Sequence, residues 1–165
     1  MKYLVINLLS LLLLLVISPA YANTQQTEQV TIKADNFEID RKNGTSTFTG
    51  HVSMQQGEMS FRADKVILYR TDQAVDKIHA YGQPAHFTRE VSVRNKALVA
   101  SRANRMEYDA RSEQLILLGD AFLTQDGNQF SGEQIEYDIR RDIVKAQRQA
   151  TFIVPTPAAN AQEVQ

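Results

Sequence analysis

The 165-residue chain contains no cysteine, which excludes disulfide bonds, thiol chemistry and every metal site that needs a cysteine ligand. It also has no strong charge of either sign, because 18 Lys and Arg residues stand against 19 Asp and Glu residues. Composition therefore does not point to nucleic acid as a partner. The three histidines, His51, His79 and His86, lack the spacing of metal ligands, and we expect them to face solvent. We predict no metal and no cofactor.

Sequence motifs of catalysis are also missing. The chain has no G-x-S-x-G elbow, no G-x-G-x-x-G fingerprint, no phosphate loop and no H-E-x-x-H pair. Ser, His and Asp residues occur, but no spacing arranges them into a catalytic group. We therefore predict that the protein is not an enzyme and that it has no catalytic residues.

A long apolar run occurs at the N-terminus, where Leu4 to Ile17 follows Lys2. Pro19 ends the run, and Ala20-Tyr21-Ala22 offers a small-residue cleavage site, a pattern typical of a secretory signal peptide. The alternative is an uncleaved membrane anchor, but the run is shorter than the ~20 residues of a membrane-spanning helix. The expected divisions are a signal peptide over residues 1–22, a flexible N-terminus over 23–29, one domain over 30–154 and a disordered tail over 155–165.

One strand pattern occurs four times in the expected domain. It begins with a small residue and a polar pair, continues as apolar, polar, apolar, and ends with Asp or Tyr. The copies begin at Ala34, Ala63, Ala103 and Gly132. Three copies lead into an apolar segment that contains a glycine, whereas Arg148 stands at this position in the fourth. A period of about 30 residues indicates a repeat architecture, and the alternation makes the repeated element β. The pattern predicts a stack of hairpins with open ends and a continuous interior.

Turn signals separate the expected strands. Asn43-Gly44 and Asp126-Gly127 suit tight hairpin turns. Asp40, Asp109 and Asp138 recur at one repeat position, where an Asp side chain commonly bonds the backbone of its own turn. The segment 92–99 has the weakest pattern, and we expect a loop there.

Alternation predicts which side chains face the interior. In the first copy, Phe37 and Ile39 lie on one face and Glu38 on the other, and the third and fourth copies repeat this arrangement. In the second copy, Val66, Ile67 and Leu68 are all apolar, so the pattern leaves the inward face undecided there. The inward residues form either an ordinary closed core or the lining of a cleft, and alternation does not distinguish the two.

Six segments together resemble a known family. They are 48–52 (FTGHV), 63–66 (ADKV), 81–87 (YGQPAHF), 106–108 (MEY), 118–121 (LGDA) and 132–137 (GEQIEY). In combination they resemble the OstA-like (LptA) family of periplasmic lipopolysaccharide-transport domains, and the likeness runs from about Val30 to Val154. The departures are local, with Arg148 at a glycine position and an insertion before Ala103.

The resemblance implies an all-β fold, an open antiparallel β-jellyroll whose two facing sheets are V-shaped in section. It implies a periplasmic protein of a Gram-negative envelope that shields the acyl chains of lipid A in its cleft. It also implies end-to-end assembly with itself, with an inner-membrane LptC-like protein and with an outer-membrane LptD-like translocon. The residues expected to bind lipid are Val30, Ile32, Phe37, Ile39, Phe48, Val52, Met54, Phe61, Phe87, Met106, Tyr108, Ile135 and Tyr137. We expect the first strand (Val30 to Ala34) and the last strand (Ile143 to Val154) to lie at opposite ends of the stack and to form the assembling edges. The residues expected at these edges are Val30, Thr31, Ile32, Ile143, Val144, Phe152 and Val154.

Other interpretations stay open from the sequence alone. The Ala20-Tyr21-Ala22 site argues against the anchored inner-membrane member of the family. Because the chain ends at Gln165, we expect no continuation into the large barrel of the outer-membrane member. Outside the family, the alternative is a structural β-stack of the cell envelope with a filled core and no lipid cargo.

Overall fold

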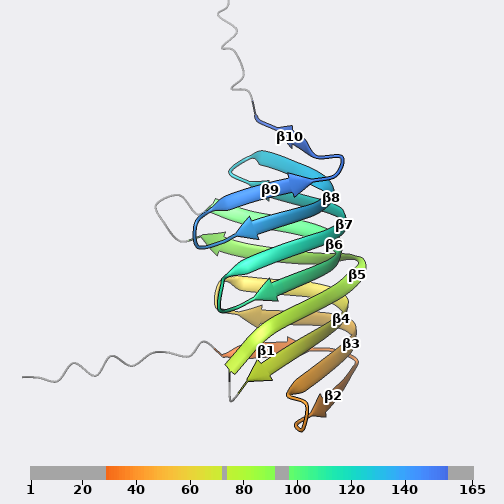
Figure 1. Ribbon diagram of the computed structural model, residues 1–165. Helices are drawn as coiled ribbons and strands as arrows, with labels where there is room; N and C mark the ends of the chain where they lie inside the picture. The colour runs from red at the N-terminus through yellow and green to blue at the C-terminus, as the bar shows by residue number, and fades with distance from the viewer. Residues whose placement is uncertain (1–28, 72–73, 92–96, 156–165) are drawn as a thin grey trace, which may run out of the picture.

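The computed structural model describes residues 29–71, 74–91 and 97–155 (Figure 1). The expected signal peptide, nearly all of the expected N-terminal linker and nearly all of the tail lie outside these ranges. No helix of the described residues is long and apolar enough to span a membrane. Within these ranges the strands are β1 (Val30–Lys33), β2 (Asn36–Asp40), β3 (Thr45–Gln56), β4 (Met59–Thr71), β5 (Ala74–Val91), β6 (Ala97–Asp109), β7 (Gln114–Gln125), β8 (Asn128–Asp138), β9 (Ile143–Gln147) and β10 (Thr151–Ile153).

All of these strands pair antiparallel in one continuous sheet. Its order is β1-β3-β4-β5-β6-β7-β8-β10, with β2 also paired to β3 and β9 also paired to β8. At one end of the stack β1 and β2 both pair with β3, and at the other end β9 and β10 both pair with β8. Figure 1 shows the two pairs of short strands at these opposite ends. The predicted all-β, open antiparallel architecture is confirmed.

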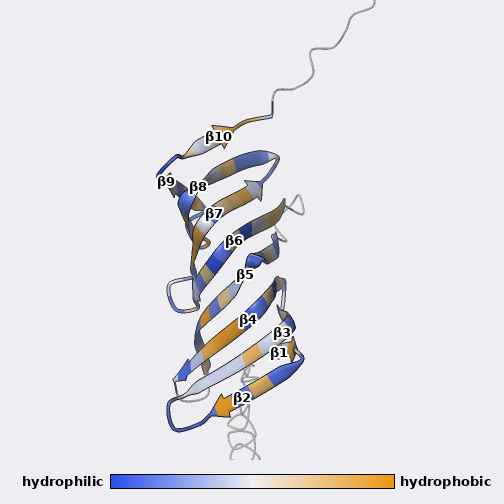
Figure 2. Ribbon diagram, turned by 90° about the vertical axis from the view of Figure 1, so that its right-hand side faces the viewer, coloured by the Kyte–Doolittle hydropathy of each residue, from blue (hydrophilic) through white to orange (hydrophobic). Residues whose placement is uncertain are grey.

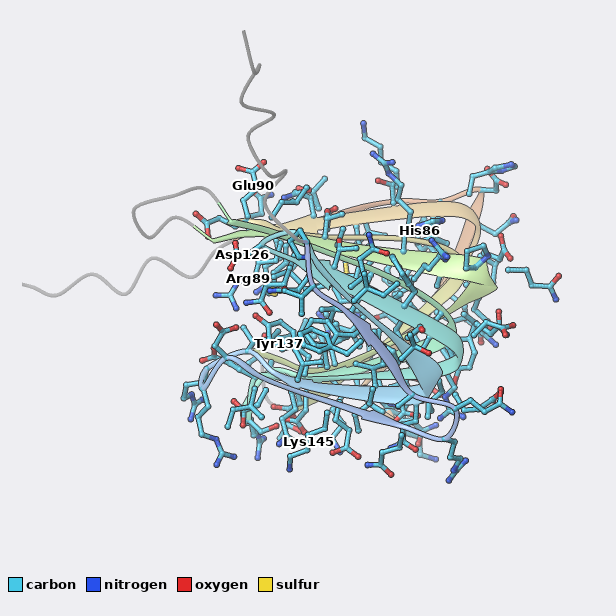
Figure 3. The ribbon with its side chains drawn as sticks, turned by 90° about the horizontal axis from the view of Figure 1, so that it is seen from above. His86, Arg89, Glu90, Asp126, Tyr137 and Lys145 are labelled. Atoms are coloured by element: carbon cyan, nitrogen blue, oxygen red, sulfur yellow. The ribbon has the colours of Figure 1, made fainter. Side chains whose placement is uncertain are left out.

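Each long strand from β3 to β8 bends near its middle, where the pairing register shifts or is interrupted, and the bends fold the sheet into two layers. Figure 3, which looks down the stack, shows the layers facing each other. Each layer contains eight strand segments among the described residues. Layer 1 consists of β1, 52–56, 59–63, 85–91, 97–103, 121–125, 128–132 and β10. Layer 2 consists of β2, 45–49, 65–71, 74–81, 105–109, 114–118, 134–138 and β9.

The bends explain the glycine of the repeat. Gly50 has φ 77°, a left-handed conformation that favours glycine, and a Cβ there would also clash with the Asp35 side chain. In the fourth copy, Arg148 and Gln149 adopt φ 56° and 58°. The chain therefore keeps the left-handed bend without the glycine, although this conformation is costly for residues with a Cβ.

The recurring aspartates stabilise turns, as predicted. The carboxylate of Asp109 accepts hydrogen bonds from the backbone N–H groups of Arg111 and Ser112, each at 3.0 Å. Asp40 and Asp138 likewise accept from the backbone N–H three residues further on. These bonds hold the pKa of each of the three carboxyl groups below its usual value.

Two expectations about the strands were wrong. The loop expected over 92–99 is shorter, because Val99 pairs with Arg89 and Leu98 pairs with Glu90; residues 92–96 lie outside the described ranges. The segment from Ile143 to Val154, expected as one last strand, is two strands that run in different layers. The left-handed backbone at Arg148 separates them, and no glycine marks that bend in the sequence.

The core lies between the layers and draws on both. Phe61 of layer 1 packs against Phe87 of the same layer, with ring centroids 4.9 Å apart, and against Tyr108 of layer 2, at 6.4 Å. In the second copy of the repeat, Val66 and Leu68 are buried and Ile67 is half-buried on the other face, which decides the parity that the sequence left open.

Candidate functional site

Three rows of inward side chains cross the whole stack, with one residue from each strand segment, and further inward residues such as Val52 and Val99 lie beside them. One row crosses layer 1 and two cross layer 2. Because paired residues of neighbouring strands share a face, each row forms a continuous surface. The row in layer 1 is Ile32, Met54, Phe61, Phe87, Ser101, Leu123, Phe130 and Phe152. The rows in layer 2 are Phe37, Phe48, Val66, Ala80, Met106, Leu117, Ile135 and Ala146, and Ile39, Ser46, Leu68, Ile78, Tyr108, Leu115, Tyr137 and Val144.

Exposure of these rows changes along the stack. Met106, in the middle, has 0% of its surface exposed, whereas Phe37 is 70% exposed at the β2 end and Phe152 is 58% exposed at the β10 end. Figure 2 shows hydrophobic positions on β2 and β10, at the two ends of the stack. The middle is therefore filled by its own side chains, and the interior presents apolar surface at both ends.

The thirteen residues expected to bind lipid all lie on the inward rows or beside them. Eight of them are buried: Val52, Met54, Phe61, Phe87, Met106, Tyr108, Ile135 and Tyr137. Val30, Ile32 and Phe48 are partly buried against the core, and Phe37 and Ile39 are exposed at the β2 end. Whether these residues contact lipid remains a prediction.

The sequence missed several residues of the same rows. Leu115 and Leu117 are buried between the layers, whereas Ile116 and Leu118 are half-buried on the outer face. All four are apolar, so alternation gave no signal in this segment. The turns on either side of this segment could have indicated which residues face inward. The pairing of Gln114 with Asp138 fixes the register of β7 on β8, and the register decides which face each side chain takes.

The residues expected at the assembling edges lie at the two ends of the sheet. Val30, Thr31 and Ile32 belong to β1, Ile143 and Val144 to β9, and Phe152 to β10, while Val154 directly follows β10. The sequence predicted a strand that carries Phe37 and Ile39, but not that this strand, β2, forms a second edge beside β1. Within the described ranges, each end of the stack thus presents one unpaired strand edge in each layer.

On the side opposite the bends, a polar contact joins the two layers. Nε2 of Gln125, from the end of β7 in layer 1, donates to Oδ1 of Asp142 at 2.6 Å, and Asp142 belongs to the turn between β8 and β9 in layer 2. The Tyr137 hydroxyl donates to the same oxygen at 3.1 Å. Burial and the neighbouring Asp142 carboxylate raise the pKa of Tyr137 to about 12, so the phenol keeps its proton. We call this side the mouth and this group of three residues the mouth contact.

The outer surface offers little for catalysis or for acyl chains. A hollow of about 780 Å³ follows the bends, but the outward residues that line it carry both charges, including Lys65 and Arg102 beside Asp64 and Asp120. No cluster of three or more metal-ligating side chains occurs among the described residues. His51 and His86 are exposed, whereas His79 is half-buried against the Tyr69 ring at 4.8 Å.

These features define a class of protein, an open two-layered β-stack with an apolar interior and free strand edges at both ends. Residues 31–143 match the family model described as LptA/(LptD N-terminal domain) LPS transport protein. The lipopolysaccharide export system protein LptA of Escherichia coli strain K12 is 32% identical over 146 residues, which cover 84% of this chain and 78% of that protein. LptA of Haemophilus influenzae is 29% identical, covering 87% of this chain and 88% of that protein.

A solved structure shows the same fold. The crystal structure of LptH from Pseudomonas aeruginosa, described as the LptA-homologous periplasmic component of a lipopolysaccharide transport device, superimposes with a TM-score of 0.74 at 24% identity, covering 78% of this chain and 96% of that chain. The chain belongs to the LptA/LptD N-terminal domain family of lipopolysaccharide transport proteins. Proteins of this family are transport proteins.

Proposed function

We propose that the protein is a periplasmic lipopolysaccharide carrier that holds lipid A acyl chains between its two layers. The observation that carries the proposal is the continuous inward surface, which runs through eight strand segments of each layer and is exposed at both ends of the stack. The chain's membership in a family of lipopolysaccharide transport proteins also supports it. Each methylene withdrawn from water contributes about 0.8 kcal/mol, so a lipid with several acyl chains needs such a shield to cross an aqueous compartment.

The proposal includes movement of the two layers. Because the middle of the interior is filled by side chains such as Met106 and Leu117, each 0% exposed, acyl chains need the layers to separate or the side chains to repack. Methionine suits repacking, since it is unbranched and flexible, and Met54 and Met106 both lie in the interior. Polar sugars would remain outside, at the mouth.

Photo-crosslinking tests the proposal. A photoreactive phenylalanine analogue at Phe48, which is partly buried against the core, should capture lipopolysaccharide on illumination. The matched control places the analogue at Ser53, an exposed position in the same strand β3. We expect at least about tenfold more adduct from Phe48, the ratio that 1.4 kcal/mol of binding preference produces. Equal labelling, or none, would instead favour a scaffold with a filled core, which the buried middle of the stack also allows.

The proposal extends to end-to-end assembly. Unpaired edges invite pairing with a further strand, and contact between two different edges generates an open chain of copies. Eight strands at about 4.8 Å give a stack of about 38 Å, so several copies would form a longer bridge. The family model joins LptA with the N-terminal domain of LptD, which supports an LptD-like translocon as the partner at one end. At the other end we propose an LptC-like inner-membrane protein, which would pair with the remaining free edge in the same way.

Changes in β10 should abolish this assembly. Proline at Phe152 removes a backbone donor and disrupts the strand, so Phe152→Pro, like deletion from Ala150 onward, should leave a folded monomer without concentration-dependent oligomers. Phe152→Ala is the matched control and should keep them, because it retains the backbone donor. Light scattering over a concentration series measures the outcome. Oligomers that persist in the truncated protein would place the interface away from β10.

A further inference from the structure

One cation lies on the inward face of layer 1. In β5, Ala85 and Phe87 are buried and point inward, while His86 and Glu90 are exposed on the outer face. The same alternation puts Arg89 on the inward face, two residues beyond Phe87 toward the mouth. Its cross-strand neighbours are Met59 and Val99, and Val99 is 0% exposed. Figure 3 shows Arg89 at the mouth, on the side where Tyr137 lies.

Arg89 is half-buried and forms no ion pair with the residues that the structure describes. Two carboxylates near the mouth are engaged elsewhere: Glu113 pairs with Arg140 at 3.3 Å, and Asp142 accepts from Gln125 and Tyr137. Asp126, which Figure 3 shows near Arg89, forms no ion pair within 4.0 Å among the described residues. A partly desolvated guanidinium without a partner is unfavourable, because it loses hydration without gaining an opposite charge.

The surroundings of Arg89 are suited to a second polar group. Its positive charge acts on both Tyr108 and Tyr137, where it opposes the burial that raises the pKa of each hydroxyl. Arg89 thus lies where the apolar interior meets a rim of tyrosine hydroxyls. An amphiphile whose acyl chains enter the interior would place its head group at this level.

We propose that Arg89 binds a phosphate group of the acylated lipid, and that it makes the carrier selective for phosphorylated over unphosphorylated lipid of the same acyl composition. A guanidinium offers several N–H donors in a planar fork that matches phosphate oxygens. Binding would supply the missing opposite charge. The inference rests on the proposed lipid-carrying function and adds the residue that recognises the lipid head group.

The test compares two lipids and three proteins. Lipid A and enzymatically dephosphorylated lipid A of identical acyl chains are titrated into the unmodified protein, Arg89→Met and Arg62→Met. Arg62 is the matched control, an exposed arginine on the outer face of the neighbouring strand β4 that forms no ion pair within the described part of the chain. The unmodified protein and Arg62→Met should prefer the phosphorylated lipid about tenfold or more, because only this lipid can accept the charged hydrogen bonds of Arg89. Arg89→Met should bind both lipids equally.

The outcomes separate the two proposals. Binding of both lipids with equal affinity by the unmodified protein would overturn the role of Arg89 and leave the carrier function standing. Binding of neither lipid would overturn the carrier function itself. Inorganic phosphate forms a further arm: it should not compete at millimolar concentration, and competition would show an anion site independent of the lipid. Arg89→Lys keeps the positive charge but lacks the planar set of guanidinium donors, so it should retain part of the preference for phosphorylated lipid. Thermal unfolding of each variant checks that it is folded.

Discussion

Phe61→Ala should lower the free energy of unfolding by about 3–5 kcal/mol, the range measured for deleting a large aromatic side chain from a packed core. Phe61 is 1% exposed and contacts rings in both layers, Phe87 at 4.9 Å and Tyr108 at 6.4 Å. Removing it would leave a cavity at the point where layer 1 packs on layer 2. Urea denaturation monitored by circular dichroism measures the change.

Phe122→Ala is the matched control, since Phe122 lies on the outer face of layer 1, half-buried beneath the Arg102 guanidinium at 4.3 Å. Its loss removes a cation–π contact and little core packing, so we expect a decrease of about 1 kcal/mol or less. Similar losses for the two variants would mean that the interior around Phe61 is not close-packed, and that acyl chains could enter there without displacing side chains.

The sequence predicted the features that depend on local chemistry. Alternation over two residues identified the strands, and the Asp109 and Asp138 positions identified turns whose hydrogen bonds the structure shows. The glycines of the repeat marked two of the bends, at Gly50 and Gly119, because a left-handed backbone has a strong residue preference. These signals lie within a few residues of each other and need no knowledge of the partner strand.

Features that depend on distant pairing were not predictable in this way. The bend at Arg148 has no glycine, and a Cβ on Gly132, in the neighbouring strand β8, would lie 2.9 Å from the Gln147 carbonyl oxygen. The absence of a side chain at Gly132, sixteen positions before Arg148, thus leaves the space that the bend needs. The position of β2 as a second edge strand was missed for the same reason, since β2 and β1 both pair with β3.

Arg89 is an inward residue that a pattern of apolar residues does not identify, because its side chain is charged. Ala85 and Phe87 set the inward parity of β5, and Arg89 continues it. A sequence interpretation that assigns inward positions by hydrophobicity passes over a charge at such a place. Charged side chains in phase with an apolar face are therefore informative, because their desolvation needs a compensating partner.

Joining the two layers covalently at the mouth should block lipid loading. The side chains of Gln125 and Asp142 bond across the mouth at 2.6 Å, and the chain has no cysteine. Gln125→Cys combined with Asp142→Cys therefore creates the only thiols, which a short bis-thiol reagent can link. If acyl chains enter by separation of the layers, the linked protein should take up at least about tenfold less fluorescent lipopolysaccharide than the same double variant before linking, as expected when opening costs more than 1.4 kcal/mol.

The control links two positions within one layer. The Ser60 and Thr88 hydroxyls bond at 2.6 Å between neighbouring strands on the outer face of layer 1, so Ser60→Cys with Thr88→Cys carries the same reagent without joining the layers. This protein should load lipid normally. Protein loaded first and linked at the mouth afterwards should retain its lipid, because the link then closes an occupied interior. Undiminished loading of the mouth-linked protein would mean that lipid enters through the ends of the stack, where Phe37 and Phe152 are exposed, and that the layers pass cargo along their axis without opening.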